Sequence, residues 1–175
     1  MELIDIMLKR RSMRKYTEDE IPEEKLEKIL QAGLLAPTSQ NRRPCEFYVI
    51  NDKATLKKLS KAKKFGAGML ADCSVAVAVF GDSDKADTWI EDCSIALSYM
   101  NLMAAEQGIG SCWCQIHLRS SLLGKDAENS VRETLIVPER YRIVGILALG
   151  IPAQEAKAHT MEDIDWSKVH RVKNV

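Results

Sequence analysis

The sequence carries no excess of charge of either sign. Its 175 residues include 25 lysines and arginines and 25 aspartates and glutamates, so the formal net charge at pH 7 is zero. A protein that holds a polyanion along its surface needs a broad positive field, which this composition does not supply. We therefore expect no nucleic acid among its partners. The length suits one domain over residues 1–175, large enough to bury a core.

Long apolar runs are also missing, and so is the pattern of a secretory leader. The stretch ELIDIMLKRR after the first residue carries acids where a signal peptide carries bases. The longest apolar stretches, such as SVAVAVF at 74–80, are too short to cross a bilayer. Five cysteines without such a leader are typical of a cytoplasmic protein with reduced thiols. We expect a cytoplasmic protein with no membrane partner.

Motifs of metal, hydrolytic and dinucleotide chemistry are sparse. Cys112 and Cys114 have no second cysteine pair or suitably spaced histidine, so buried thiols on one face of a strand explain them better than zinc. His117, His159 and His170 are scattered, form no hydrolytic triad, and are expected to be structural or exposed. No G-x-G-x-x-G motif follows a strand pattern, so no resident dinucleotide is predicted.

Helix and strand patterns alternate along the chain without a linker, repeat or low-complexity tract. This α/β alternation implies a central sheet sandwiched by helices. The stretch at 73–81 is almost continuously apolar, which indicates a strand covered on both faces. Helices are predicted at residues 2–11, 22–36, 54–64, 85–107 and 120–135, and strands at 45–51, 73–81, 110–118 and 142–152.

Apolar spacings of three and four predict the inner faces of three helices. From about residue 153 the chain becomes a polar, irregular tail with isolated apolar anchors, Ile164, Trp166 and Val169, as in tails that pack over their own domain or a partner subunit. The predicted faces are Leu3, Ile4, Met7 and Leu8 in the first helix, Leu26, Ile29, Leu30 and Leu34 in the second, and Trp89, Cys93, Ala96, Leu97, Met100 and Ala104 in the long one.

The stretch RRSMRKY at 10–16 concentrates cations in an otherwise neutral chain. Arg10, Arg11, Arg14 and Lys15 surround Ser12. Three interpretations compete: a nucleic-acid patch, a solvated helix end, and a pocket for a small phosphorylated ligand. The neutral composition disfavours the first. Arginine forks and a serine hydroxyl suit phosphate oxygens, whereas cations at a helix C-terminus favour its dipole, and composition alone does not separate these two.

Two further stretches complete a pattern. RRSMRKYT at 10–17 is followed by the loop APTSQNRRPCEF at 36–47, and then by a segment from Asp92 to GIGSCW at 108–113. In this order and spacing the chain resembles the nitroreductase family, flavin-dependent reductases that bind FMN at a dimer interface. The likeness extends from about residue 3 to residue 152. It implies an α+β sandwich, with a central, mostly antiparallel sheet flanked by helices, and a tail packed on the partner subunit of a homodimer.

The resemblance also implies roles for individual residues. Arg10 and Ser12 would hold the FMN phosphate, with Arg11 beside them, and Arg14 would reach the pyrimidine edge of the isoalloxazine near N1 and the C2 carbonyl. The other subunit would line the flavin with Pro37, Thr38, Ser39 and Asn41. Trp113, Cys114, Gln115 and Ile116 would pass along the ring, with a backbone N–H donating toward N5. Lys168 or Arg171 in the tail would complete the phosphate site.

Several positions depart from the family pattern. Arg43 replaces the usual glutamine and Cys45 the usual tryptophan, which alters contacts at that edge of the pocket. Cys114 and Gln115 stand where small residues are expected, which alters access above the ring.

The resemblance implies an FMN-dependent oxidoreductase. Hydride would pass from NAD(P)H, a visiting substrate, to N5 of FMN and then to an acceptor such as a nitroaromatic, a quinone or a flavin, by a ping-pong mechanism. No catalytic acid or base is needed, because FMN carries the chemistry. Two alternatives remain: a flavin-binding sensor or store without turnover, and a thiol redox or metal module built on Cys112 and Cys114.

Overall fold

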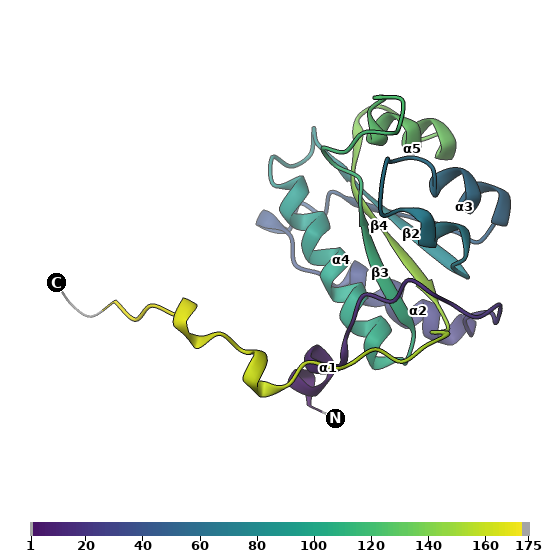
Figure 1. Ribbon diagram of the computed structural model, residues 1–175. Helices are drawn as coiled ribbons and strands as arrows, with labels where there is room; N and C mark the ends of the chain where they lie inside the picture. The colour runs from purple at the N-terminus through teal and green to yellow at the C-terminus, as the bar shows by residue number, and fades with distance from the viewer. Residues whose placement is uncertain (1, 173–175) are drawn as a thin grey trace.

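The structure, a computed structural model, describes residues 2–172 and centres on a four-stranded sheet (Figure 1). The strand order is β1-β2-β4-β3, and each neighbouring pair is antiparallel. This confirms the predicted α+β class with its antiparallel sheet. The strands are β1 Cys45–Ile50, β2 Val75–Asp82, β3 Gly110–Gln115 and β4 Tyr141–Gly150.

Helices cover both faces of this sheet. The helices α2 and α4 pack together over one face, and α3 and α5 lie over the other (Figure 1). The helix α5 starts later than predicted, because the Asp126 carboxylate accepts hydrogen bonds from the N–H groups of Glu128 and Asn129 and so caps the helix there. The helices are α1 Leu3–Lys9, α2 Glu23–Leu34, α3 Lys53–Leu59, α4 Trp89–Glu106 and α5 Ala127–Leu135.

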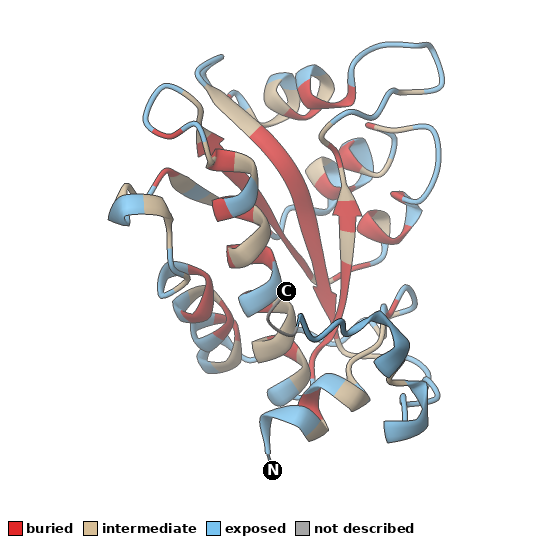
Figure 2. Ribbon diagram, turned by 90° about the vertical axis from the view of Figure 1, so that its left-hand side faces the viewer, coloured by how far each residue is buried: buried red, intermediate tan, exposed pale blue. Residues whose placement is uncertain are grey.

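The central strands β2 and β4 are buried on both faces, as the apolar run at 73–81 predicted (Figure 2). Val77 and Val79 point into the core under α4, whereas Ala78 and Phe80 point into the core under α3 and α5. The predicted inner stripe of the long helix is also confirmed. It is buried at Trp89, Cys93, Ala96, Leu97, Met100 and Ala104.

The predicted inner faces of the first two helices are partly wrong. In α1 only Ile6 is buried, whereas Leu3 and Met7 are 58% and 42% exposed. In α2, Leu34 is 68% exposed. Periodicity shows that a helix has an apolar side, but not that the same chain covers it. The structure therefore leaves apolar helix surface open to solvent.

The tail leaves the body of the molecule (Figure 1). It first runs beside the N-terminal segment, where the Ala153 N–H donates to the Lys15 carbonyl and the His159 N–H to the Leu8 carbonyl. Beyond that point Trp166 and Val169 are 67% and 55% exposed. Packing of this tail on a partner subunit stays a prediction. Within residues 2–172, no helix combines the length and apolar character needed to cross a bilayer.

Candidate functional site

The cationic stretch after α1 is fixed against the end of the sheet. Met13 is buried, and its N–H donates to the Ser111 carbonyl at 2.9 Å. Tyr16 is half-buried, and its hydroxyl donates to the Met13 carbonyl at 2.6 Å. Ser12 and Arg14, on either side of Met13 in the chain, are both exposed. Burial raises the pKa of Tyr16 above its ordinary value, so its hydroxyl stays a donor.

This segment lies beside the outer edge of β3, an edge strand of the sheet. In an antiparallel pair, backbone groups alternate between facing the partner strand and facing away. The Ser111 carbonyl faces away from β4, because it accepts the Met13 N–H. Trp113 and Gln115 share that orientation, and their N–H groups point to the open side of β3. A row of outward-facing backbone N–H donors thus lies next to the cationic segment.

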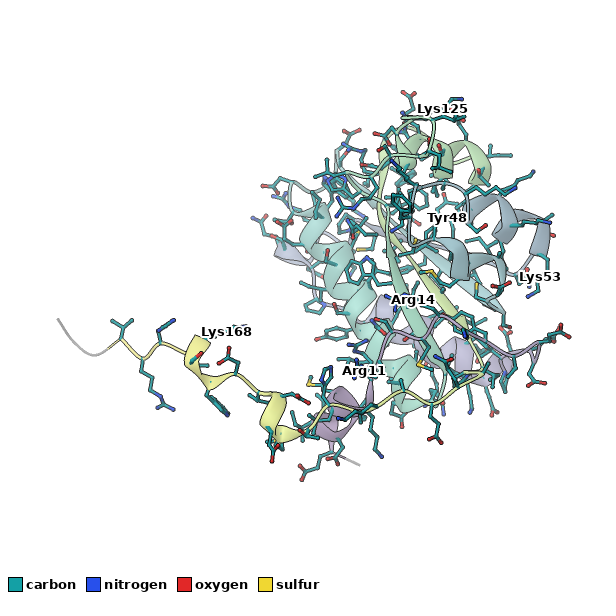
Figure 3. The ribbon with its side chains drawn as sticks, viewed as in Figure 1. Arg11, Arg14, Tyr48, Lys53, Lys125 and Lys168 are labelled. Atoms are coloured by element: carbon teal, nitrogen blue, oxygen red, sulfur yellow. The ribbon has the colours of Figure 1, made fainter. Side chains whose placement is uncertain are left out.

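The cations beside this edge are available for a ligand. Among the described residues, Arg10 and Arg14 have no carboxylate partner, and the Arg14 guanidinium only approaches the Ser12 carbonyl at 3.5 Å. Arg11 is engaged, since its guanidinium donates to the Lys157 carbonyl. Figure 3 shows Arg11 near α1 and Arg14 in front of β3. Arg10, Ser12 and Arg14 therefore form a group of cationic and hydroxyl donors without a carboxylate partner among the described residues.

Two hollows flank the edge of β3. The larger, of about 900 Å³, lies at the start of the strand between the α1 end and the tail, and the smaller, of about 340 Å³, lies at the other end. The larger is lined by residues including Lys9, Arg10, Arg11, Gly110, Ser111 and Ala153, and the smaller by Lys63, Lys64, Phe65, Leu118, Arg119 and Ser120.

The side chains of β3 divide between two environments. Trp113 lies on the α4 side, where its indole N–H donates to the Gln115 side chain at 3.0 Å. Gly145 of β4 makes room for this indole, because a Cβ there would lie 2.6 Å from the Trp113 Nε1. Cys114 and Ile116 are fully buried in the opposite core. Neither of these two side chains reaches the open edge of β3.

The thiols of β3 are inert side chains of the core. Burial raises the pKa of Cys112 above its ordinary value, against the opposing effect of Arg14, and raises that of Cys114 to about 11. Both thiols are protonated at neutral pH, whereas nucleophilic and metal-binding cysteines react as thiolates. Buried thiols on one strand face, as the alternation predicted, are confirmed.

The loop between α2 and β1 is rigid and strained. Gln40, Asn41 and Arg43 all have positive φ angles, of 51°, 55° and 47°. Such a conformation costs free energy and persists only where surrounding contacts hold it. The Arg43 N–H donates to the Thr38 hydroxyl at 3.0 Å, and its Nε donates to the Asn41 side chain at 2.8 Å. The unusual Arg43 therefore fixes the loop from within.

Contacts with α4 and with the turn before it hold the same loop from outside. The Ser39 N–H donates to the buried Asp92 carboxylate at 2.9 Å, and Arg42 forms an ion pair with Asp87 at 3.0 Å. Pro37 and Asn41 remain exposed. The loop thus presents a preformed surface of small polar groups.

The structure does not bring this loop and the cationic segment together in one chain. The loop rests on Asp92 at the start of α4, whereas Met13 rests on Ser111, beyond the end of that helix. From Asp92 to Glu106 the helix rises by about 21 Å. The loop also leads into β1, at the opposite edge of the sheet from β3, about 14 Å away.

The tail residues are likewise remote from the cationic segment. Figure 3 shows Lys168 far out on the tail, away from Arg11 and Arg14. Lys168 forms a local ion pair with Asp165 at 3.5 Å, and Arg171 is exposed. Neither reaches Arg10 within this chain.

Comparison with known proteins shows the family to which the sequence belongs. The model of the nitroreductase family matches residues 7–67 and 61–151. A protein of Archaeoglobus fulgidus, provisionally named an NADH dehydrogenase/NAD(P)H nitroreductase, is 34% identical over 98% of both chains. The chain belongs to the nitroreductase family.

Two further proteins are similar to this chain over most of their length, one of them with a solved structure. The solved FMN-dependent nitroreductase of Clostridium difficile R20291 is 42% identical, with a TM-score of 0.94 over 98% of this chain and 99% of that one. The NADH dehydrogenase of Thermus thermophilus is 29% identical over 85% of both chains.

One cation at the edge of β3 was missed from the sequence. Lys63 donates to the Gln115 carbonyl at 2.9 Å, so it lies in the row of outward-facing backbone groups. It belongs to the lysine-rich stretch at 54–64, which resembles an ordinary solvated helix face. Only the fold, by laying the loop after α3 against β3, distinguishes Lys63 from its neighbours.

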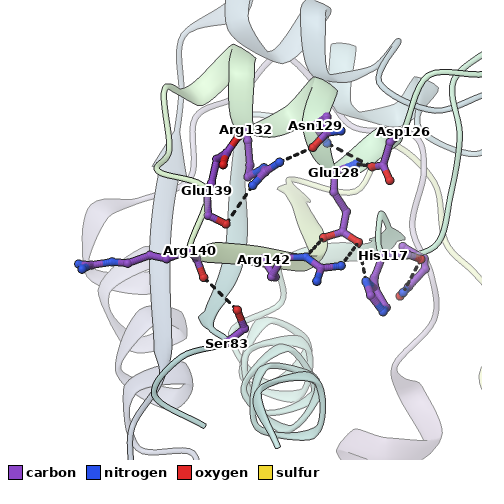
Figure 4. Close-up of polar contacts among 10 residues, drawn as sticks. Ser83, His117, Asp126, Glu128, Asn129, Arg132, Glu139, Arg140 and Arg142 are labelled. Carbon is purple, nitrogen blue, oxygen red and sulfur yellow. Dashed lines mark hydrogen bonds and ion pairs between the residues drawn. The ribbon is translucent and has the colours of Figure 1, made fainter. Parts of the chain in front are cut away.

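A buried ion cluster was also missed (Figure 4). Glu128 of α5 is almost fully buried and accepts hydrogen bonds from His117 Nδ1 at 2.6 Å and from Arg142 Nε at 2.9 Å. Burial alone would raise the pKa of Glu128, but the bonds from Arg142 and His117 outweigh it and lower this pKa. The cluster joins α5, the end of β3 and the start of β4, and so fixes the strand end that follows Gln115.

We expect Glu128→Gln to lower the free energy of unfolding at pH 7 by about 1.5–3 kcal/mol, as for one charged hydrogen bond. Because the folded-state pKa of Glu128 is lowered, its contribution is complete above the unfolded pKa of about 4.3 and is lost as the pH falls through the folded value. Urea unfolding should therefore show a gap between wild type and variant that shrinks below about pH 4. The exposed Glu133→Gln on the same helix is the control, and an equal loss there would contradict this role.

Proposed function

We propose that this chain is an FMN-dependent NAD(P)H oxidoreductase. The observation that carries the proposal is the outer edge of β3, where Arg10, Ser12 and Arg14, which have no carboxylate partner among the described residues, adjoin outward-facing backbone N–H groups. Support also comes from the FMN-dependent nitroreductase that is 42% identical over nearly the whole chain. Bound FMN would supply two-electron chemistry, taking hydride from NAD(P)H and delivering it to a nitroaromatic, quinone or flavin acceptor in alternating half-reactions.

The residues present fit the FMN group. Arg10 and Ser12 provide a cation and a hydroxyl for the phosphate, with no competing carboxylate among the described residues. The N–H groups of Trp113 and Gln115 provide donors for the ring, and β3 holds them rigidly. Trp113 closes the site from the α4 side, since Gly145 lets its indole lie close to the sheet.

Arg14 would tune the electronics of the site. A guanidinium held in front of β3 stabilises negative charge that develops near it, and this raises the reduction potential. We expect Arg14→Ala to lower the two-electron potential of bound flavin, by about 30 mV for each 1.4 kcal/mol of lost stabilisation. A dye-equilibrated reductive titration measures this shift. Lys15→Ala is the matched control and should leave the potential almost unchanged. An unchanged potential in Arg14→Ala itself would show that Arg14 does not have this role.

We propose that two copies share each site. The 37–44 loop lies at one end of α4, and Arg10 lies near the other. The loop and Arg10 of one chain therefore cannot contact the same ligand. A second copy would bring its Thr38, Ser39 and Asn41 to the β3 edge of the first. It would also cover the apolar surface of α1 and receive the exposed tail, and Lys168 or Arg171 would then lie near a phosphate.

The purified protein is expected to bind FMN and to consume NADH or NADPH when an acceptor is present. After dialysis against excess FMN and gel filtration, the protein should retain flavin absorbance and show steady nucleotide oxidation at 340 nm with a quinone. Retained flavin without nucleotide oxidation by any acceptor would favour the sensor or store. A protein that keeps neither FMN nor FAD would overturn the proposal.

A further inference from the structure

Two cysteine thiols lie against each other, away from the edge of β3. Cys45 opens β1 and Cys93 lies near the start of α4, and their Sγ atoms are 3.6 Å apart. Neither forms a disulfide in the structure. Cys93 is fully buried, whereas Cys45 is only half-buried and can be reached from solvent.

The backbone of β2 creates the space for this contact. Gly81 pairs with Cys45 across the two strands, and a Cβ at Gly81 would lie only 3.0 Å from the Cys93 Sγ. Because Gly81 has no side chain, the Cys93 thiol occupies that position and meets Cys45. The pair thus results from the register of β1 and β2 together with the position of α4.

We propose that Cys45 and Cys93 are an oxidisable dithiol, which hydrogen peroxide converts to an intramolecular disulfide between β1 and α4. The two sulfur atoms need to approach by about 1.5 Å to reach the S–S bond length of about 2.0 Å. Cys45 is the first residue of an edge strand, so the shift is local. The bond would fix the base of the 37–44 loop, whose Ser39 already rests on Asp92, the neighbour of Cys93.

The order of the two steps follows from exposure. The Cys45 thiolate attacks one peroxide oxygen and the O–O bond breaks, which gives a sulfenic acid at Cys45 and, after protonation, one water. The Cys93 sulfur then attacks the Cys45 sulfur, the S–O bond breaks, and the Cys93 proton leaves with the hydroxide as a second water. The contact with Cys45 and burial raise the pKa of Cys93, so its sulfur becomes nucleophilic only as its proton passes to the departing oxygen, which the 3.6 Å contact between the two sulfurs allows. Two thiols lose two hydrogens, and one peroxide becomes two waters.

The other three cysteines provide an internal comparison. Cys73, Cys112 and Cys114 are buried in the core on the opposite face of the sheet. Cys112 and Cys114 project in parallel from alternate positions of one strand, a direction that keeps their sulfurs apart. These three are expected to stay reduced while the Cys45–Cys93 pair closes.

The test is a thiol count on the purified full-length protein, with and without bound flavin. It is treated briefly with hydrogen peroxide, quenched with catalase, denatured and titrated. The five thiols should fall to three, which is five less the two of the pair, and peptide mapping without reductant should join Cys45 to Cys93 within one chain. Five surviving thiols, or a link between other cysteines or between two chains, would overturn the proposal.

Two variants separate the steps. Cys45→Ser should keep all four of its remaining thiols under the same treatment. Cys93→Ala should stop at the sulfenic acid, so that dimedone labels Cys45 once and wild type far less. A thiol loss in Cys45→Ser equal to that of wild type would also overturn the proposal. Mapping of the wild-type protein keeps the result decisive if either variant folds poorly.

Discussion

Arg10→Ala is expected to weaken FMN about 10- to 150-fold while leaving riboflavin almost unaffected. The range corresponds to about 1.5–3 kcal/mol for one charge-assisted hydrogen bond. Riboflavin is the informative comparison because it has the same ring and no phosphate. Arg10 lines the larger hollow and has no carboxylate partner among the described residues, so its loss leaves no other charge unpaired. Fluorescence quenching of each flavin on titration with protein gives both dissociation constants.

Lys15→Ala is the matched control for this measurement. Lys15 is an exposed cation of the same stretch, so removing it changes the local charge equally. If the phosphate is held by a specific contact with Arg10, the control should shift FMN affinity far less. Equal losses of FMN and riboflavin in Arg10→Ala would instead assign Arg10 to the end of α1, where its N–H already bonds the Ile6 carbonyl.

Mixing two variants, at an FMN concentration too low to load either one alone, is expected to restore about a quarter of the wild-type activity. One carries Arg10→Ala, and the other carries Thr38→Ala together with Asn41→Ala in the loop. If each site takes Arg10 from one chain and the loop from the other, a mixed dimer has one site with both lesions and one site with neither. Random pairing makes about half of the dimers mixed, so about a quarter of all sites are intact. The variants are unfolded together, refolded and assayed for NADH oxidation.

Differently tagged variants confirm that mixed dimers have formed. A tandem purification isolates the mixed species, which should have about half the activity of wild type. Refolded wild type, treated identically, corrects for incomplete recovery. Activity no higher than the sum of the two variants, in dimers proven to be mixed, would mean that each chain builds its whole site alone.

Periodicity predicted the elements of this fold better than the surroundings of their side chains. The stripe of α4 from Trp89 to Ala104 was recognised because the same chain buries it. The stripe of α1 has the same spacing, yet Leu3 and Met7 are exposed. Spacing describes one helix, whereas burial depends on what packs against each side chain, and no part of the described chain covers Leu3 and Met7.

The residues of the candidate site were also predicted only where a local motif marks them. The arginines and the 37–44 loop were found from their motifs, because each motif is local. Lys63 and the Glu128 cluster depend on contacts between segments distant in the sequence, such as Glu128 with Arg142. No local pattern marks these residues. In the sequence, Lys63 looks like any solvent-exposed lysine of the lysine-rich stretch at 54–64.

The anchoring of the cationic segment has a consequence for synthesis of the chain. The Met13 N–H donates to the Ser111 carbonyl, and the Thr17 N–H donates to the Ile151 carbonyl. The cationic segment is synthesised early, whereas the two residues that anchor it are synthesised late. Chains emerge from the ribosome N-terminus first, and contacts between distant segments wait for the second partner. Arg10 to Arg14 therefore have no binding surface until β4 is complete. A ribosome-bound nascent chain lacking residues after 150 would present these cations without capturing flavin.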